Sequence, residues 1–461
     1  MCKNYKVWWY KSIVILISLV LINCDNETNK PNCSHDWSNW NVIDYPTCTM
    51  NGLEERICKL CSNIDAQTIA ALGHECDWEV TVSASFFSEG EKKGTCKRCG
   101  HEVIKNIIKN ISWSSITGID STFGTSIIRS IIWGGISGQE KFVAVGGNGK
   151  IGYSYNGINW TSIPENNVDV LVLWDITWGG LVGQEKFIAV GSDGKMFYSS
   201  DGIMWHEIPR IFNNFGIEPN DRILGVTWGG TTSQEKFIAV GDNGEMTYSP
   251  DCVNWTPVHR GTGSGESTFN NSISGITWGG IFGQEKFVAI NSYDGMAYSS
   301  DGIVWTSIPA GTGAGQSTFG TYNYIYDITW GGSIGYEKFI AVGQNGKMAY
   351  SFDGVNWTAI PAGTGIGRSS FNTNDLILGV SWGCFDGEDM FIAVGEKGKM
   401  AYSSDGISWI AISAGAESGH STFESSTSIQ NITYGGLPGD EIFIAVGPSG
   451  RMAYSVVNIV D

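Results

Sequence analysis

The chain repeats one sequence pattern seven times, and this repetition restricts its fold more than any other feature. The period is 45 to 52 residues, and the copies begin at Trp133, Trp178, Trp228, Trp278, Trp330, Trp382 and Tyr434. Self-similarity at this period is typical of propellers and solenoids rather than of independent domains. The repeats therefore predict one array of similar units.

Each repeat contains four short apolar runs. In the fifth copy these runs are residues 325–330, 339–342, 347–351 and 356–360. They are rich in β-branched and aromatic residues and are bounded by Gly, Asn and Asp, which indicates strands and tight turns. The glycines interrupt every helical window, so a helical repeat is excluded. We predict an all-β fold, a seven-bladed β-propeller over residues 110–461.

The fourth strand provides the most specific prediction. A fourth strand with a Trp occurs only six times after Trp133, and a seventh copy, NISWSSI, lies upstream at residues 110–116. We predict that residues 111–116 complete the last blade beside residues 451–455, which would close the ring and remove an open sheet edge. In the alternative, residues 456–460 form the fourth strand and residues 111–116 are a linker.

The turn before each fourth strand has a recurrent sequence. Residues 199–205, SSDGIMW, resemble an Asp-box, the repeat of bacterial neuraminidases and of many other propellers. The resemblance implies a structural hairpin, in which Asp accepts backbone hydrogen bonds, Gly supplies a positive φ and Trp packs in the blade. Asn156 replaces Asp in the first copy, and Cys252 replaces Gly in the third. The box aspartates are Asp201, Asp251, Asp301, Asp353 and Asp405.

The same resemblance raises the question of sialidase activity. Those enzymes resemble one another in a six-bladed ring with an arginine triad, a Tyr–Glu nucleophile pair and an Asp acid, whereas this chain has seven repeats. A glycosidase also needs two carboxylates at a set separation, but the acids here recur at equivalent positions in each blade. We therefore expect no catalytic residues and no sialidase activity. The propeller arginines occupy no repeated strand position: Arg129, Arg210, Arg222, Arg260, Arg368 and Arg451.

Segments that differ between the copies are better candidates for function. The connections from a fourth strand to the next first strand are long and polar, and the last of them contains His420. In propellers these connections lie on one face around the channel, so we expect ligand binding there. In the alternative, their glycines only form turns between blades and their phenylalanines pack in the core. No Lys and no helix follows the glycines, which argues against a phosphate-binding loop.

Residues 32–109 form a different, Cys/His-rich segment. Two patterns combine a Cys/His pair with a Cys-x-x-Cys some twenty residues later, a spacing typical of tetrahedral zinc sites. A segment of this size with few aliphatic residues needs such cross-links to fold. Disulfides are the alternative, because an exported chain meets an oxidising compartment. The first predicted site is Cys33, His35, Cys58 and Cys61, and the second is His74, Cys76, Cys96 and Cys99.

This segment also resembles Cys/His-rich repeats of bacterial surface proteins. That resemblance implies another register for the first site, with Cys48 as an alternative ligand beside Cys58, Cys61 and His74. Phe86 stands where the second copy would carry the matching Cys, which makes Cys76 a replacement there.

The first 24 residues have the features of an export signal. Three lysines precede an apolar run at residues 12–22, which is too short for a lasting transmembrane helix. The following Leu-Ile-Asn-Cys resembles a bacterial lipobox of the looser spirochaete type, which implies lipidation of Cys24. Residues 25–31 would then be a polar tether. We expect a lipid-anchored protein of the bacterial cell envelope, on the outer-membrane surface or the periplasmic face.

Charge narrows the choice of partners. The formal net charge is −18 and the pI is about 4.7, which argues against nucleic acid and against a polybasic membrane contact. We expect a monomeric binding scaffold that recognises a protein or a glycan, as some box-bearing propellers act as assembly factors. The alternatives are a hydrolase on the loop face and a structural envelope protein.

Overall fold

The computed structural model divides the chain into two compact units. One comprises Met1–Glu79 and Lys93–Ile104, and the other comprises Val80–Lys92 and Lys105–Asp461. The propeller unit thus begins before residue 110 and includes a segment that we assigned to the Cys/His-rich part. No helix among the described residues is long and apolar enough to span a bilayer. The structure describes residues 35–118, 122–164, 168–209, 221–260, 266–293, 295–311, 315–320, 322–412, 414 and 421–460.

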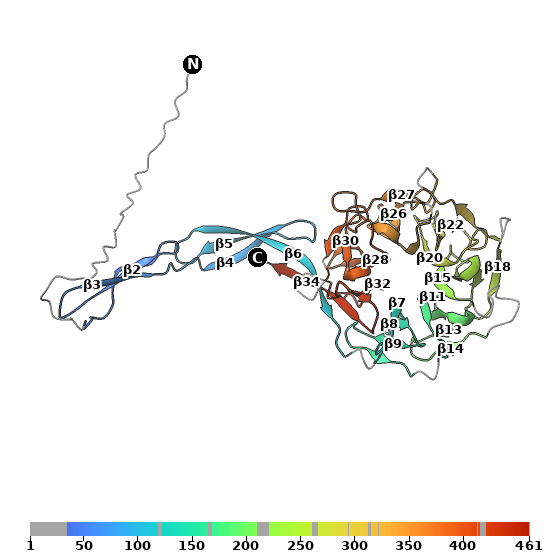
Figure 1. The fold of residues 1–461 in the computed structure, drawn as a ribbon, viewed down its shortest axis with the longest axis horizontal. Coiled ribbons are helices and arrows are strands. Elements are labelled where there is room, and N and C mark those ends of the chain that lie inside the picture. The colour runs from blue at the N-terminus through green and yellow to red at the C-terminus, as the bar shows by residue number, and fades with distance from the viewer. Residues whose placement is uncertain are drawn as a thin grey trace, which may run out of the picture. The chain divides into compact units, whose positions relative to one another are not determined.

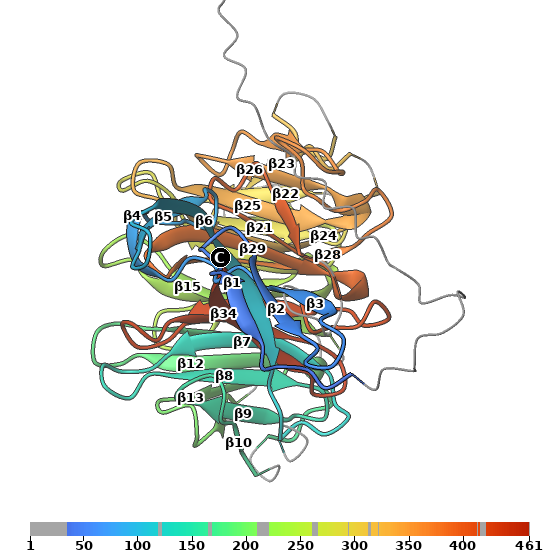
Figure 2. The ribbon, with the colours of Figure 1, turned by 90° about the vertical axis from the view of Figure 1, so that its left-hand side faces the viewer.

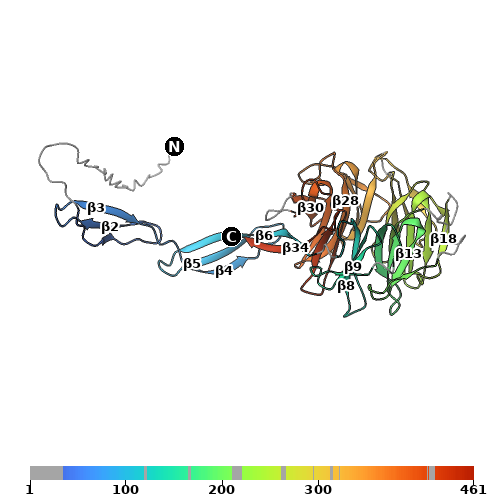
Figure 3. The ribbon, with the colours of Figure 1, turned by 60° about the horizontal axis from the view of Figure 1, so that its bottom comes forward.

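The Cys/His-rich unit is built from short antiparallel strands. Strands β1 (Asn41–Asp44), β2 (Gly52–Ile57) and β3 (Ile64–Ile69) form a three-stranded sheet in that order. Strands β4 (Cys76–Val82) and β5 (Gly90–Cys96) follow, and Figure 3 shows them next to each other. The first residues of β4, up to Glu79, and the last residues of β5, from Lys93, belong to this unit. The hairpin between them, Val80–Lys92, belongs to the other unit.

The second unit contains seven four-stranded antiparallel blades within the described residues, arranged as a ring (Figure 1). Blade one is β7 (Ile128–Gly134), β8 (Lys141–Gly146), β9 (Ile151–Ser154) and β10 (Thr161–Ser162). Blade two is β11 (Leu173–Gly179), β12 (Lys186–Gly191), β13 (Met196–Ser199) and β14 (His206–Glu207). Blade three is β15 (Ile223–Gly229), β16 (Lys236–Gly241), β17 (Met246–Ser249) and β18 (Thr256–Arg260), with a short parallel strand β19 (Glu266–Ser267) added.

The remaining blades repeat this arrangement. Blade four is β20 (Ile273–Gly279), β21 (Lys286–Asn291), β22 (Met296–Ser299) and β23 (Thr306–Ile308). Blade five is β24 (Ile325–Gly331), β25 (Lys338–Gly343), β26 (Met348–Ser351) and β27 (Thr358–Ile360). Blade six is β28 (Ile377–Phe385), β29 (Glu388–Gly395), β30 (Met400–Ser403) and β31 (Ile410–Ile412). Blade seven is β32 (Asn431–Gly435), β33 (Ile442–Val446), β34 (Met452–Val460) and β6 (Glu102–Ser115), and its sheet continues beyond β6 with β5 and β4.

The first strand of each blade is the innermost one. Figure 1 shows β7, β11, β15, β20, β28 and β32 closest to the centre of the ring, and Figure 2 shows β7, β8, β9 and β10 in succession. The second strands are almost completely buried, with Phe and Ala at 0–2% exposure. Within the described residues, four connections from a second to a third strand form 3₁₀ turns: η3 (Ser192–Gly194), η4 (Asp242–Gly244), η5 (Gln344–Gly346) and η6 (Glu396–Gly398).

Blade seven combines strands from opposite ends of the repeat array. Strand β6 pairs antiparallel with β34, from Ser115 opposite Ala453 to Ile108 opposite Val460, and both strands lie side by side in Figures 1 and 3. Residues 456–460 continue β34 and do not form a strand of their own. Strand β6 therefore occupies the fourth position that we predicted for residues 111–116.

The Trp-Gly-Gly motif makes the contact between neighbouring blades. A methyl group on Gly179 would overlap the Trp228 side chain of the next blade, and the first glycine of every copy has such a neighbour. Between blades six and seven the neighbour is Tyr434, and between blades seven and one Trp133 lies against Gly435. The ring of Trp228 packs in turn on Phe237, with ring centres 4.5 Å apart. Gly is required at this position because the aromatic ring fills the space of a side chain.

The predicted box aspartates hold the turns before the fourth strands. Asp201 Oδ1 accepts hydrogen bonds from the backbone N–H groups of Ile203 and Met204, both at 2.8 Å, and from Ser199 Oγ at 2.9 Å. Asn156 accepts the same two backbone bonds in blade one. These contacts favour a structural role. The same acceptor pattern occurs at Asp251, Asp301, Asp353 and Asp405.

Candidate functional site

The innermost strand contains a β-bulge at the same place in each of the first six blades. In β7, Ile128 pairs with Gly146 and Ser130 pairs with Val145, so that Arg129 is left out of the ladder. Equivalent register shifts occur in β11, β15, β20, β24 and β28. A bulge leaves one residue unpaired and re-aims its side chain. The six bulged residues are Arg129, Trp174, Leu224, Ser274, Tyr326 and Leu378.

These six residues, together with Gln430 just before β32, form what we call the bulge ring. Each of the seven side chains is half-buried, whereas the residue before each of them has 0% exposure. Because the first strands are innermost (Figure 1), the backbone of the bulge ring lies around the inside of the propeller. The ring therefore presents six residue types at seven equivalent positions of a repeated frame. The buried neighbours are Ile128, Leu173, Ile223, Ile273, Ile325, Ile377 and Ile429.

A cluster of cationic and aromatic side chains lies at the bulge ring in blades one to three. Arg129 Cζ lies 4.6 Å from the centre of the Trp174 ring, and Arg222 Cζ lies 5.6 Å from the same ring. Arg222 donates from Nε and Nη2 to the two carboxylate oxygens of Asp242, each at 2.9 Å. Arg129 donates from Nη1 to Gln430 Oε1 at 3.1 Å. The hydrogen bonds to Asp242 raise the pKa of Arg222, whereas burial lowers the pKa of Arg129.

Aromatic residues occupy the ring near blades four and five. The rings of Tyr293 and Tyr324 have centres 5.3 Å apart, and those of Tyr324 and Tyr326 are stacked at 6.1 Å. A hydrogen bond with Tyr293 raises the pKa of Tyr324, and burial raises that of Tyr326. The phenols of Tyr324 and Tyr326 are therefore neutral at physiological pH. This part of the ring can contact apolar surface and also exchange hydrogen bonds.

The position after the bulge contains two aspartates that connect blades. Asp175 accepts hydrogen bonds from Ser130 Oγ at 2.7 Å and from the Val226 backbone N–H at 2.9 Å, which joins blades one, two and three. Asp327 accepts a bond from the Val380 N–H at 2.9 Å, which joins blades five and six. Burial raises the pKa of Asp175 to about 6 and that of Asp327 to about 7. Their bonds favour a structural role over catalysis.

The connections that we expected to carry function are only partly within the described residues. His420 and Arg210 lie outside them. The phenylalanines that end these connections are packed in the core, as the structural alternative predicted. Their exposed fractions are between 1% and 3%: Phe269, Phe319, Phe371 and Phe423.

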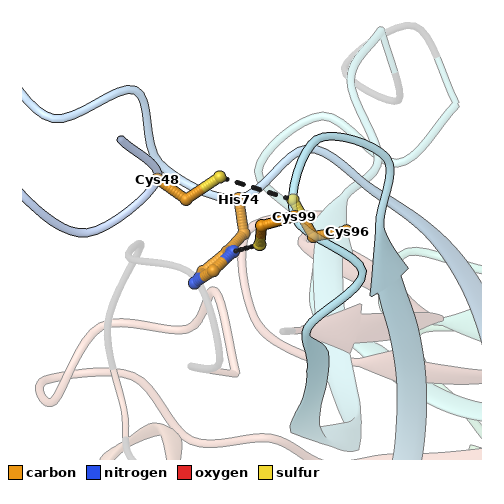
Figure 4. A group of neighbouring side chains, drawn as sticks. All are labelled: Cys48, His74, Cys96 and Cys99. Carbon is orange, nitrogen blue, oxygen red and sulfur yellow. Dashed lines mark hydrogen bonds between the residues drawn. The ribbon is translucent and has the colours of Figure 1, made fainter. Parts of the chain in front are cut away.

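The Cys/His-rich unit contains two groups of side chains that could bind a metal ion. The ligand atoms of His35, Cys58 and Cys61 lie within 4.8 Å of one another in the first group. The second group has the same limit and consists of Cys48, His74, Cys96 and Cys99, which point toward one another in Figure 4. Cys24 and Cys33 lie outside the described residues.

The two Cys-x-x-Cys segments adopt the same backbone turn. In the second, the Cys96 N–H donates to the His101 carbonyl at 2.9 Å, and the Gly100 N–H donates to the Cys96 carbonyl at 2.8 Å. In the first, the Cys58 N–H and the Ser62 N–H make the corresponding bonds, each at 2.8 Å. Gly100 and Ser62 both have positive φ, of 71° and 56°. The unit is therefore an internal repeat.

This repeat explains why Cys76 is absent from the second group. The Lys59 N–H bonds to the Asp36 carbonyl as the Lys97 N–H bonds to the Glu75 carbonyl, so that His35 corresponds to His74. Cys76 then corresponds to Trp37 and begins β4, where its Cβ faces Gly94. The pairing of His74 with Cys76 that we expected is replaced by His74 with Cys48. Cys48 also does not join Cys58 and Cys61, the register implied by the bacterial repeats.

Two distances in the second group fit a tetrahedral zinc ion. Zn–S bonds of about 2.3 Å and Zn–N bonds of about 2.0 Å place tetrahedral ligands about 3.8 Å apart for S–S pairs and about 3.5 Å apart for S–N pairs. Cys48 Sγ lies 3.7 Å from Cys96 Sγ, and Cys99 Sγ lies 3.5 Å from His74 Nδ1. The hydrogen bond with His74 lowers the pKa of Cys96 to about 5, whereas burial raises the pKa of Cys48 to about 11. The donor set is thus suited to a thiolate-binding metal.

Comparisons with known proteins establish the fold class only. No protein-family model matches the chain, and no curated protein matches it. Among solved structures, YCF48 bound to D1 peptide is 14% identical, with a TM-score of 0.51 over 75% of this chain and 95% of that one. The WD40 β-propeller domain of Doa1 is 10% identical, with a TM-score of 0.50 over 76% of this chain and 97% of that one. The protein therefore has a β-propeller fold.

The bulge ring was not found by reasoning from the sequence. A signal for it exists, because the varied residue follows an Ile or Leu that is present in all seven copies. Variation within an otherwise repeated strand indicates a position that packing does not determine. A strict reading of the strand as alternating positions hides this residue, since the bulge shifts the register by one.

Proposed function

We propose that the protein is a binding scaffold that recognises a protein partner, as a peptide segment, through the bulge ring. The single observation that carries this proposal is the presence of six different residue types, all partly exposed, at the seven copies of one position of the innermost strands. Scaffold positions are otherwise the same in each blade, so selection for packing does not account for this variety. Mixed aromatic, cationic and amide groups are typical of protein recognition surfaces.

The propeller fold supports this proposal. YCF48, with which the chain shares that fold, is described in complex with a D1 peptide, so a propeller of this kind can accommodate a peptide. Trp, Tyr and Arg, the residue types most enriched among binding hot spots, are all present in the ring. The two aspartates at the neighbouring position are engaged in bonds between blades, which favours recognition over hydrolysis.

Variants of the bulge ring and of a loop between the first and second strands test the proposal. Phage-displayed peptides would be selected on the immobilised chain without residues 1–24, and their affinities measured for ring and control variants. Trp174→Ala and Tyr326→Ala should each weaken binding by tenfold or more. Phe282→Ala, in the loop between the first and second strands and 96% exposed, should not. Loss of binding only in the Phe282 variant would refute a role for the ring.

We also propose that the Cys/His-rich unit binds structural zinc. Cys48, His74, Cys96 and Cys99 would hold one ion, and His35, Cys58 and Cys61 would hold a second together with Cys33. Elemental analysis should find two zinc ions per chain, and Cys99→Ser should remove one, whereas Cys252→Ala, in a buried propeller position, should remove none. Absence of zinc together with oxidised cysteines in thiol titration would favour disulfides.

The proposed location is the bacterial cell envelope. It rests on the apolar run and the Leu-Ile-Asn-Cys sequence, which are suited to export and to lipidation of Cys24. Metabolic labelling with a palmitate analogue should modify the wild-type chain and leave Cys24→Ala unlabelled. Equal labelling of both would exclude Cys24 as the anchor.

A further inference from the structure

Arg129 is a cation of the bulge ring without an anionic partner among the described residues. Within the described part of the chain its guanidinium donates one hydrogen bond, from Nη1 to the neutral side chain of Gln430. Burial is the only cause of its lowered pKa, and no carboxylate offsets it. Arg129 Nε is buried and has no hydrogen-bond partner. A buried donor without an acceptor is unfavourable, so the free edge of this guanidinium is suited to an incoming oxygen atom.

Arg222 shows what such an edge binds in this protein. Arg222 and Arg129 both lie over the Trp174 ring, at 5.6 Å and 4.6 Å. Arg222 uses Nε and Nη2 to hold both oxygens of the Asp242 carboxylate at 2.9 Å. Arg129 has the same edge, formed by Nε and Nη2, with no carboxylate on it. Paired N–H donors in this geometry match a carboxylate in both charge and shape.

Trp174 provides a second donor at the same place. Its indole Nε1 is also buried without a hydrogen-bond partner. Because these two unsatisfied N–H groups belong to side chains of adjacent blades that stack at 4.6 Å, one anionic group could satisfy both.

We propose that Arg129, with Trp174, binds a carboxylate of the peptide partner. This inference rests on the proposed function and adds the chemical class of the ligand. The rest of the bulge ring favours a peptide over an acidic glycan. Leu224 and Leu378 are apolar, and a uronic acid chain would need hydrogen-bonding groups at these positions. The carboxylate can belong to an acidic side chain or to a peptide C-terminus, since both present the same oxygens.

Fluorine NMR of 5-fluorotryptophan-labelled protein tests the inference directly. The Trp174 resonance would be assigned with Trp174→Phe and followed at about physiological salt, where weak surface attraction is screened. The probes are Ac-Glu-NH₂ and Ac-Ala-OH, which carry a side-chain and a terminal carboxylate, and the neutral Ac-Gln-NH₂ and Ac-Ala-NH₂. A saturable shift with either acid, and none with its neutral counterpart, is expected.

Matched arginine variants complete the test. Arg129→Gln should weaken the response to the acid by about 10- to 100-fold, as expected for loss of a charge-assisted contact. Arg222→Gln should have a smaller effect, because the guanidinium of Arg222 is already paired with the Asp242 carboxylate. Equal responses to acid and amide, an unchanged affinity in Arg129→Gln, or a response to methyl glucuronide alone would overturn the inference.

The outcomes separate this inference from the proposed function. If selected peptides bind through Trp174 and Tyr326 but need no acid and no Arg129, the peptide scaffold stands and the carboxylate site does not. If no selected peptide depends on the ring, the proposed function itself is wrong.

Discussion

Trp133 of blade one lies against Gly435 of blade seven in the same way as Trp228 lies against Gly179 within the array. The junction between the last and the first blade therefore has the same packing as the junctions between consecutive blades. A cluster of buried residues spans this junction and includes Ile128 and Phe142 of blade one with Ile444 of blade seven.

This contact predicts the effect of a single methyl group. Gly435→Ala would force the new Cβ into the Trp133 ring, and overpacking of this kind costs about 1–3 kcal/mol. Gly179→Ala is the matched control within the array and should lower the stability by a similar amount in urea unfolding. If only Gly179→Ala were destabilising, blade one would not pack against blade seven in solution.

The hairpin between β4 and β5 predicts a second effect. Phe86, 5% exposed, stacks on Phe385 with ring centres 5.5 Å apart, and its N–H donates to Glu388. Phe86→Ala should therefore lower the free energy of unfolding by about 3 kcal/mol. Phe87→Ala, at a neighbouring residue that is 37% exposed, should cost much less. Equal effects would mean that Phe86 is not buried in solution.

Lys109 is expected to fix the same contact electrostatically. Its ammonium group lies 2.8 Å from Asp386 and 2.7 Å from Glu388, with the side chain 9% exposed. Burial opposes this charge, but the bonds to the two acids outweigh burial and raise the pKa of Lys109. Lys109→Met should destabilise the propeller, because Glu388 would lose its cation. The double variant Lys109→Met with Glu388→Gln should recover part of the loss, and no recovery would argue against the ion pair.

The inter-blade aspartates predict a dependence of stability on pH. The pKa values of Asp175 and Asp327 are about 6 and about 7, above the ordinary value of 3.8. The folded state thus binds their protons more tightly, and this stability is present below pH 3.8 and lost as the pH rises through 6 to 7. Asp175→Asn and Asp327→Asn should flatten the decline between about pH 4 and pH 7 in thermal unfolding. An unchanged slope would show that these carboxyls titrate normally.

The aspartates of the turns before the fourth strands predict that an acceptor oxygen matters more than the charge. Asp201→Ala leaves two backbone N–H groups without their acceptor and should cost about 1–2 kcal/mol. Asp201→Asn should be nearly neutral, because Asn156 accepts the same bonds in blade one. Urea unfolding of the two variants would distinguish an acceptor role from a role for the charge. A large loss in Asp201→Asn would indicate that the charge itself matters.

Much of the fold was predictable from the sequence because repeats average out local ambiguity. One copy alone leaves the length of each strand uncertain, but seven aligned copies give four strands in register and show that a Trp strand is missing after Tyr434. The strand that occupies this missing fourth position is β6, and it was predictable because its Trp113 matches the Trp of the other fourth strands. The boundary between the two units, upstream of β6, was not predictable, because Phe86 packs with Phe385 through contacts that no local pattern predicts.

The candidate sites were less predictable for specific physical reasons. The bulge moves Arg129 and Trp174 out of the alternation that identifies core and surface in a strand. In the Cys/His-rich unit, ligand types and the Cys-x-x-Cys turns were evident, but the choice of Cys48 over Cys76 depends on strand pairing. A carbonyl at Thr47 accepts a bond from the Leu72 N–H at 2.9 Å and so brings Cys48 near His74. Spacing alone does not determine such a contact.

The composition of blade seven has a consequence for biosynthesis. Ser112 of β6 leaves the ribosome 344 residues before Val456 of β34, whose carbonyl accepts its hydroxyl hydrogen bond. During translation the edge of β6 that later pairs with β34 therefore stays unpaired until the six blades between the two strands have been synthesised. The nascent chain would be most prone to aggregation or capture by chaperones in that interval, and shielding of β6 would govern its yield in the cell.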